Sequence, residues 1–198
     1  MLRSLFLLLL SVAFFTGCSL VASEKLSWPL ERAAYRPTPL HFGMYVTPDP
    51  AMNPISLPER FTGYHVGVDF EITSGEKDKD VPVYAICSGE VIFSGFAEGY
   101  GGLISQHCTI DNEPVVVLYG HLQLDSLPDI ASTLTAGKKI ALLGADKSKD
   151  TDDNRKHLHL GIHRGTTSVF LGYVQTEDEL KSFMDSKKIL RRWGVIAP

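Results

Sequence analysis

The chain has 198 residues, which is enough for one domain of ordinary size. Hydrophobic residues make up 44% of it and charged residues 21%, a composition typical of globular proteins. The formal net charge of −4 excludes a broadly basic surface, so we expect no nucleic-acid partner.

The first 17 residues have the pattern of a secretory leader. Arg3 precedes an apolar run from Leu5 to Phe15 that is too short to span a bilayer well, and small residues follow it. Residues 15–18 (Phe-Thr-Gly-Cys) resemble a bacterial lipobox, with Phe15 where Leu is usual. We therefore expect cleavage before Cys18 and acylation of this cysteine, which would anchor the protein to a membrane. An ordinary secreted protein with an incidental cysteine is the alternative.

A lipid anchor would place the protein in the cell envelope. Ser19 resembles the residue that directs lipoproteins to the outer membrane, so we expect a periplasm-facing outer-membrane protein, or a cell-surface protein in a host with one membrane. Residues 18–35 are expected to form a tether. Cys87 and Cys108 would lie in an oxidising compartment, where a disulfide and two separate buried thiols both remain open.

The rest of the chain predicts one domain over residues 36–170 and a helical tail over 171–198. The domain begins with a Pro-rich stretch, residues 37–58, which we expect to be an irregular arm packed on the domain, because proline is excluded from central strands. In the tail, Thr176 and Glu179 form a capping-box pattern. Four apolar residues then follow near helical spacing and are expected to pack on the core: Leu180, Phe183, Met184 and Leu190.

Seven short runs of strand-forming residues alternate with Gly, Asp and Asn turn signals. They are residues 66–72, 82–86, 90–93, 103–107, 114–119, 139–143 and 157–163. This spacing predicts an all-β fold of antiparallel sheets with a short C-terminal helix, and it does not fit βαβ units. Two charged inserts interrupt the pattern: residues 74–80, expected to be a hairpin tip, and a longer loop at 145–156 that leads directly into the last strand.

Three histidines fall on alternate positions of that last strand, His157, His159 and His163. Side chains two residues apart in a strand point to the same face, about 6.6 Å apart. Three imidazoles on one face would hold a metal ion, act beside one, or merely line a surface. The pattern by itself leaves these alternatives open.

Two other segments carry residue types that bind metals or move protons. His65 and Asp69 would lie about 13 Å apart on a straight strand, too far to share an ion, so a common metal requires the chain to curl near Gly67. His121 follows Gly120 at the end of an apolar strand and could point into a cleft. Alone, the first pair is better interpreted as solvated surface, and His121 as a core histidine.

Together, in this order, the three segments resemble the lysostaphin/LytM-type zinc endopeptidases of bacterial cell walls. The resemblance covers roughly residues 60–165. It rests on His65-x-x-x-Asp69, Tyr119-Gly120-His121-Leu122 and His157-x-His159, and on the supporting segments 81–85, 89–91, 99–101 and 137–144. It implies the duplicated-hybrid-motif fold of that family, an antiparallel sheet or sandwich with a zinc-bearing groove.

The resemblance also implies roles for five residues. His65, Asp69 and His159 would be the ligands of one Zn²⁺ ion, and His121 and His157 the two catalytic imidazoles. Two neutral imidazoles and one carboxylate would leave a fourth position open for water, whose pKa would fall toward about 7. No His-Glu-x-x-His helix is present to supply a base, so the histidine pair would act as general acid and base.

Peptidoglycan is the substrate that the resemblance implies, and the bond between D-alanine and a diamino acid is expected ahead of a glycine–glycine bond. The alternative is a non-catalytic wall-binding or amidase-activating lipoprotein of the same fold, but such relatives typically lose ligands, and all five residues are present here. His163, His107 and His41 have no place in the pattern and are expected to be rim or structural residues.

This sequence departs from the family pattern around the last strand. Lys156 stands where Pro is common, Leu160 and Gly161 stand where Phe-Glu is common, and Gly102 replaces a common Asn. The 145–156 loop is longer and more charged than usual, and such loops line the substrate groove. Whether this loop blocks the groove, and whether a regulatory protein of the envelope moves it, is left open by the sequence.

Overall fold

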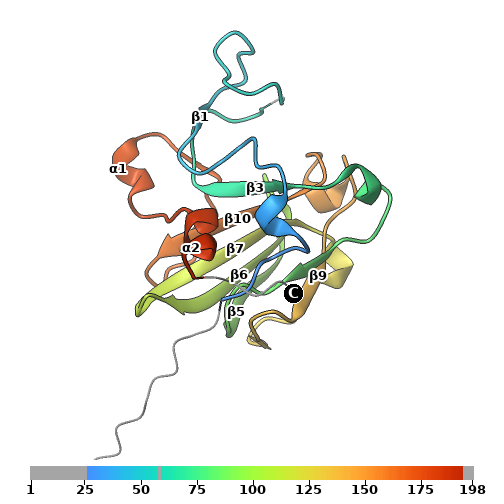
Figure 1. Cartoon of the computed structure of the whole chain (residues 1–198), viewed down its shortest axis with the longest axis vertical. Coiled ribbons are helices and arrows are strands. Elements are labelled where there is room, and N and C mark those ends of the chain that lie inside the picture. Colours follow the sequence, from blue (N-terminus) through green and yellow to red (C-terminus); the bar gives the residue numbers. More distant parts are fainter. Residues whose placement is uncertain (1–25, 58, 194–198) are drawn as a thin grey trace, which may run out of the picture.

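The computed structural model describes residues 26–57 and 59–193. The predicted leader, Cys18 and residues 19–25 of the predicted tether lie outside the described residues. The largest element is an antiparallel six-stranded sheet with strand order β3-β10-β7-β6-β5-β8 (Figure 1). Its strands are β3 (Gly67–Glu71), β5 (Gly89–Ala97), β6 (Gly101–Ile110), β7 (Glu113–Leu122), β8 (Thr133–Leu134) and β10 (His157–Arg164).

Two smaller antiparallel sheets complete the domain. One joins β1 (Tyr45–Val46), β2 (Gly63–His65) and β11 (Tyr173–Val174), and the other joins β4 (Pro82–Tyr84) to β9 (Lys139–Leu142). All seven predicted strands are present, and the predicted all-β antiparallel fold is confirmed.

The middle of the large sheet is covered on both faces. Along β7, Val117 and Tyr119 belong to the main core, whereas Leu118 between them packs with Leu103 and Tyr100 on the opposite face. This alternation is the period of two that a strand imposes. A strand buried on both faces has an almost continuous apolar run, which explains why residues 114–119 are so easily recognised.

The prediction of a tether is wrong for the part that the structure describes. Leu26, Trp28 and Leu30 are buried in the main core, as is Ala33, the first residue of the 3-10 helix η1 (Ala33–Tyr35). Backbone hydrogen bonds fix this segment to the domain, since the amide of Ser27 donates to the carbonyl of Ile86. The apolar side chains at every second position are stabilised by burial, so the segment packs and does not hang free.

The Pro-rich arm runs along the outer edge of β3. The amides of Asp69 and Glu71 donate to the carbonyls of Leu40 and Pro37, so the arm covers the side of β3 that faces away from β10. Leu40 of the arm is fully buried. An irregular, proline-containing segment of this kind shields a strand edge without extending the sheet.

The prediction that residues 74–80 form the tip of a hairpin is wrong. They contain the 3-10 helix η2 (Ser74–Glu76) and connect β3 to β4, which belong to different sheets. Both carboxylate oxygens of Glu76 accept hydrogen bonds from the buried Arg36 guanidinium, at 2.6 and 2.7 Å. This ion pair joins the connection to the arm and explains why a charged segment is folded against the domain.

The C-terminal tail forms two short helices in place of one, α1 (Glu177–Leu180) and α2 (Ser186–Arg192). The predicted capping box of Thr176 and Glu179 begins α1. The helical path is interrupted because Phe183 bridges to His163 and the amide of Met184 donates to Ile162, so the intervening chain follows the edge of β10. Ile189 and Leu190 of α2 pack into the core.

Cys87 and Cys108 form a disulfide, which decides between the two alternatives left open by the sequence. Both residues are buried in the main core, with Cys108 on β6. None of the helices in the described part of the chain is long and apolar enough to cross a membrane.

Candidate metal centre and active site

His65 and Asp69 come together because the chain changes sheets between them. His65 ends β2, in the three-stranded sheet, and Gly67 begins β3, in the six-stranded sheet. Val66 at the crossing donates its amide to the carbonyl of Gly172. The His65 Nε2 and Asp69 Oδ1 atoms lie 3.3 Å apart, so the curl that a shared metal requires is present.

His159 completes the cluster from β10, where it lies directly opposite Asp69 on β3. Its Nδ1 is 3.1 Å from Asp69 Oδ1 and 3.0 Å from His65 Nε2. Ligand atoms bound to zinc at about 2.0–2.1 Å with tetrahedral angles are separated by about 3.3 Å, close to the three distances observed. All three residues are buried, and they form a group that could hold a metal ion among the described residues. The donor set and its spacing therefore fit zinc.

Contacts around the cluster fix which ligand atoms face inward. His65 Nδ1 lies 3.4 Å from the carbonyl of His41 and would donate to it, which leaves Nε2 as the free lone pair. Burial alone would raise the pKa of the Asp69 carboxyl, but the imidazoles of His157, His65 and His159 hold it well below its usual range. Asp69 is therefore an anion at neutral pH, as a metal ligand must be.

His121 reaches the site through a β-bulge. On β6, Gly102 and Leu103 face Leu122 and Gly120 of β7, which leaves His121 as the extra residue. Its φ is 65°, in the left-handed region. Val117 and Tyr119, at the alternate positions before it, point into the core, whereas His121 lines a pocket. The local backbone thus turns the imidazole out of the core and toward the cluster.

His157 is the partner of His121 in this pocket. The two ring centroids are 4.3 Å apart, and His157 Nε2 is 3.0 Å from Asp69 Oδ2. His157 Nδ1 would donate to the carbonyl of Arg155, 2.9 Å away, so that Nε2 is the atom available to accept a proton. The structure thus brings all five predicted residues together; the role of each remains a prediction.

The residues matched by a protein-family model include all five. The model for peptidase family M23 matches residues 63–170, more than half of the chain. The chain belongs to peptidase family M23. Among curated protein sequences, none matches this chain.

Solved structures share the fold of this M23 chain. The catalytic domain of the antimicrobial peptidase lysostaphin from Staphylococcus simulans superposes with a TM-score of 0.53 at 21% identity, over 79% of this chain and 92% of that domain. A second structure of the antimicrobial peptidase lysostaphin superposes with a TM-score of 0.56 at 20% identity, over 87% of this chain and 55% of the lysostaphin chain. LytU superposes with a TM-score of 0.51 at 18% identity, over 80% of this chain and 88% of the LytU chain. At these identities the likeness shows a common fold, and the predicted lysostaphin-type fold is confirmed.

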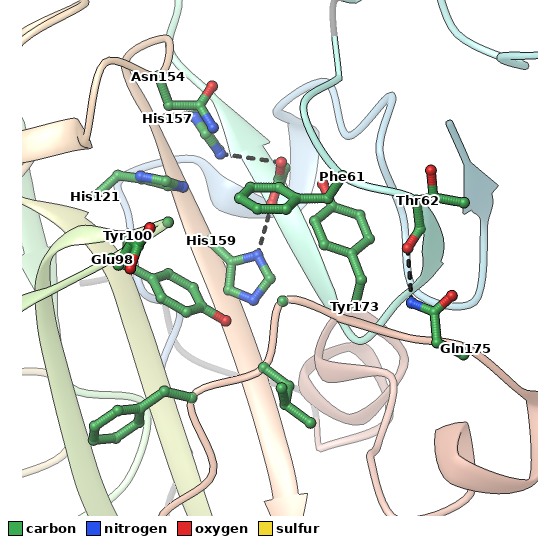
Figure 2. Close-up of a pocket in the computed structure, with 15 residues that line it drawn as sticks. Phe61, Thr62, Glu98, Tyr100, His121, Asn154, His157, His159, Tyr173 and Gln175 are labelled. Carbon is green, nitrogen blue, oxygen red and sulfur yellow. Dashed lines mark hydrogen bonds and ion pairs between the residues drawn. The ribbon is translucent and has the colours of Figure 1, made fainter. Parts of the chain in front are cut away.

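The M23 site opens into a cavity of about 260 Å³ (Figure 2). Asp69, His121, His157 and His159 line its inner end. Three apolar side chains on its rim are partly exposed to solvent: Phe61, Phe170 and Leu171. The remaining lining residues are Thr62, Glu98, Gly99, Tyr100, Asn154, Gly172, Tyr173 and Gln175. Burial lowers the pKa of His159 to about 4 and that of His121 well below its usual value, so both are neutral at pH 7.

Two neighbours of the cluster, Tyr100 and Arg155, have no role in the sequence-based prediction, although residues 99–101 belong to the segments that carry the resemblance. The buried ring of Tyr100 packs edge-on against His159, with ring centroids 5.3 Å apart, and lies 5.9 Å from the ring of His121. Gly99 and Gly101 on either side of it both have a positive φ, a signal of a special turn. Arg155 bonds to the Asp69 carboxylate. The sequence does contain an indication of this contact: Asp69 and Glu71 are two acidic residues on the same face of one strand, and a nearby cation would stabilise both.

The other histidines lie outside the cluster. His163 is partly exposed and its ring packs against Phe183, 4.9 Å away. The Nε2 atom of His107 lies 3.0 Å from the carbonyl oxygen of Thr166. His41 is exposed, and it contributes to the site only through its backbone carbonyl.

Proposed function

We propose that this M23 chain is a zinc-dependent endopeptidase that hydrolyses peptide cross-links of bacterial peptidoglycan. The observation that carries the proposal is the arrangement of the five residues. Three potential ligands converge within hydrogen-bond distance of one another, and two further imidazoles face the same cavity without belonging to the ligand set. A structural zinc site would instead be closed by four ligands.

The zinc ligands would be His65 Nε2, Asp69 Oδ1 and His159 Nδ1. A bound zinc would supply Lewis acidity and would lower the pKa of water at its open position. The protein's own contribution is to hold two neutral imidazoles and one carboxylate at the required spacing. Gly67 makes this approach possible, since a side chain there would collide with the His159 ring.

His157 and His121 would move the protons of the reaction. His157 Nε2 is oriented by the hydrogen bond on the opposite side of its ring, and His121 is held by the bulge. Burial lowers the pKa of His121, so its imidazole is neutral at pH 7 and carries a free lone pair. One imidazole would take the proton of the attacking water, and the pair would return a proton to the leaving amine. No covalent intermediate is required.

The groove supports a peptide substrate. The partly exposed rings of Phe61 and Phe170 flank the cavity and offer apolar contacts to an extended chain. The peptide bond between D-alanine and a diamino acid is the cleavage site that we propose. Lysostaphin, whose fold this chain shares, is an antimicrobial peptidase, and a wall substrate for this chain is consistent with that likeness.

We propose the cell envelope as the location, with an acyl anchor on Cys18, on the outer membrane or on the surface of a single-membrane host. The leader and the lipobox-like segment support this proposal. The Cys87–Cys108 disulfide adds independent support, because disulfides persist in oxidising compartments.

The proposal is tested by treating purified peptidoglycan with residues 19–198 and identifying the released fragments by mass spectrometry. We expect cleaved cross-links, one zinc per chain, and loss of cleavage on chelation. His121→Asn is the sharpest variant, because asparagine tolerates the left-handed backbone of this position. It should retain zinc and lose about 10²- to 10⁴-fold in cleavage rate.

Two outcomes would contradict the proposal in different ways. Full zinc occupancy without cleavage of any cross-link would favour the non-catalytic, amidase-activating alternative. Loss of zinc from His121→Asn would show that the assignment of ligands and catalytic imidazoles is wrong.

A further inference from the structure

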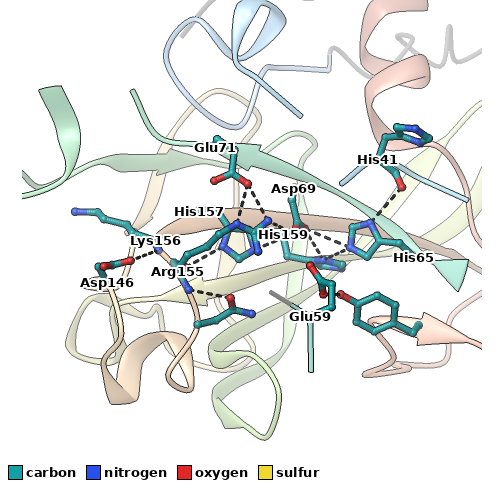
Figure 3. Close-up of polar contacts among 12 residues, drawn as sticks. His41, Glu59, His65, Asp69, Glu71, Asp146, Arg155, Lys156, His157 and His159 are labelled. Atoms are coloured by element: carbon teal, nitrogen blue, oxygen red, sulfur yellow. Dashed lines mark hydrogen bonds and ion pairs between the residues drawn. The ribbon is translucent and has the colours of Figure 1, made fainter. Parts of the chain in front are cut away.

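Arg155 lies next to the metal centre and forms hydrogen bonds with three residues in or beside it. Its Nη2 donates to Asp69 Oδ2 at 2.8 Å. Its Nε and Nη2 donate to Glu71 Oε1 at 3.0 and 2.8 Å. Its backbone carbonyl accepts the hydrogen bond from His157 Nδ1. One residue therefore holds a predicted metal ligand with its side chain and a predicted catalytic imidazole with its backbone (Figure 3).

The two oxygens of Asp69 have different partners. Oδ1 faces the ligand atoms of His65 and His159, whereas Oδ2 accepts from Arg155 and lies near His157 Nε2. The carboxylate is almost fully buried, so few other groups compete for these positions. A carboxylate that accepts a charged hydrogen bond on one oxygen is restrained to present the other oxygen to the metal.

The 145–156 loop is built to present Arg155 at this point. Lys156 is buried and its ammonium donates to the carbonyls of Lys77 and Lys79, while its amide donates to Asp146. Earlier in the loop, the Thr151 hydroxyl bonds to the carbonyl of Asn154. The guanidinium is mostly buried, with 17% of the side chain exposed, and stays charged. The loop is thus fixed on both sides of Arg155.

We infer that Arg155 is a positioning residue of the metal centre, which holds Asp69 with Oδ1 toward the ligand cluster and couples the 145–156 loop to that orientation. This inference rests on the proposed function, since it assigns a role toward the zinc ion. It explains the departure of this loop from the family pattern: its length and charge supply a cation to Asp69 and Glu71 at the start of β10.

Zinc affinity distinguishes positioning from simple electrostatics, because the two act in opposite directions. Removing a positive charge beside a cation site strengthens metal binding, whereas releasing a ligand weakens it. We expect Arg155→Gln to bind zinc about 10- to 100-fold more weakly than the wild-type chain, as measured by competition with a chromophoric chelator. Arg155→Lys keeps the charge but lacks the planar fork, and we expect an intermediate loss of about 3- to 10-fold.

Arg164→Gln is the matched control. Arg164 is the last residue of β10, the strand that begins two residues after Arg155, and its ion pair with Glu113 is outside the site. This variant should bind zinc like the wild type. Thermal unfolding of the metal-free variants separates misfolding from a positioning effect. If Arg155→Gln does not fold, the Arg155→Lys comparison decides the question.

Each outcome bears on the inference. Zinc binding by Arg155→Gln that is as tight as in the wild type, or tighter, would overturn it, as would an equal loss in Arg164→Gln. A wild-type chain that binds zinc but does not cleave peptidoglycan would refute the proposed function, while the affinity series would still decide the role of Arg155. A wild-type chain that binds no zinc would refute both.

With zinc saturating, the wall-cleavage assay adds a second readout. A positioning residue acts mainly on the chemical step, so Arg155→Gln should lower kcat with little change in KM. A change confined to KM would instead show that Arg155 contacts the substrate, and would contradict the inference.

Discussion

Gly67→Ala tests whether the approach of β3 to β10 builds the metal centre. A Cβ atom at position 67 would lie 2.6 Å from both Cε1 and Nε2 of His159 and 2.9 Å from the carbonyl oxygen of Leu160. Ordinary contacts of this kind begin at 3.4 Å, so the imidazole must retreat by 3.4 − 2.6 = 0.8 Å or the strands must separate. Either change moves a predicted ligand relative to Asp69.

The size of the effect follows from this displacement. A misplacement of about 1 Å costs about 100-fold in rate, and disturbed ligand support costs about 10- to 100-fold in metal affinity. We therefore expect Gly67→Ala to lose both zinc affinity and cleavage by one to two orders of magnitude. Overpacking should lower the free energy of unfolding of the metal-free chain by about 1–3 kcal/mol.

The assay compares Gly67→Ala with Gly75→Ala, at a glycine whose added Cβ would meet no atom within 4 Å. Chelator competition gives the zinc affinity, urea unfolding gives the stability, and fragment analysis of digested peptidoglycan gives the activity. Gly75→Ala should match the wild type in all three. Wild-type zinc binding and cleavage by Gly67→Ala would refute the reasoning, because it would mean that the close contact with His159 is not needed.

Two further predictions concern stability away from the site. Glu76→Gln should lower the free energy of unfolding by about 1–3 kcal/mol at pH 7, because buried Arg36 loses its charged partner. The hydrogen bond from Arg36 lowers the pKa of Glu76 to about 2 from 4.5, so in urea unfolding this difference should be complete above pH 4.5 and vanish as the pH falls through 2. Replacing Cys87 and Cys108 together by alanine should cost about 3 kcal/mol, since the bridge closes a loop with a sequence separation of 21; dithiothreitol should destabilise only the wild type.

The strands that the sequence reveals are those with enough residues to show a pattern. β6 and β7 each have ten residues, and their apolar runs and turn signals make them visible. The strands β1, β2, β8 and β11 have two or three residues each, too few to define a period. They form by pairing with partners that are distant in sequence, which no local pattern encodes.

The two errors in the fold prediction have different origins. The charged segment 74–80 has the composition of a hairpin tip, and nothing local in it shows that Glu76 pairs with Arg36, 40 residues away. The prediction of a tether over residues 18–35 rests on their position after the expected anchor, and it is wrong for residues 26–35, which the structure describes. The apolar residues at alternate positions of this segment, Leu26, Trp28 and Leu30, were the available signal that it packs on the core.

The site shows what residue types can and cannot predict. The resemblance to the lysostaphin/LytM-type family singles out the five histidine and aspartate residues, whereas each of the three segments alone is better explained as surface or core. Two features of the backbone bring them together: the change of sheet at Val66 and the bulge at His121. Glycines near both points permit the close approach, but they do not specify its direction, so the geometry comes from tertiary pairing.

Arg155 illustrates how charge can be misjudged without a structure. A loop with many charged residues is usually a solvated surface, and residues 145–156 fit that description by composition. In the folded chain Lys156 is buried among backbone carbonyls and Arg155 is paired with two carboxylates, so these cations are structural parts of the site. Because Asp69 is shared between the ligand cluster and this loop, any movement of the loop that withdraws Arg155 would also release one oxygen of Asp69. Loop position and metal affinity are therefore expected to change together in this chain.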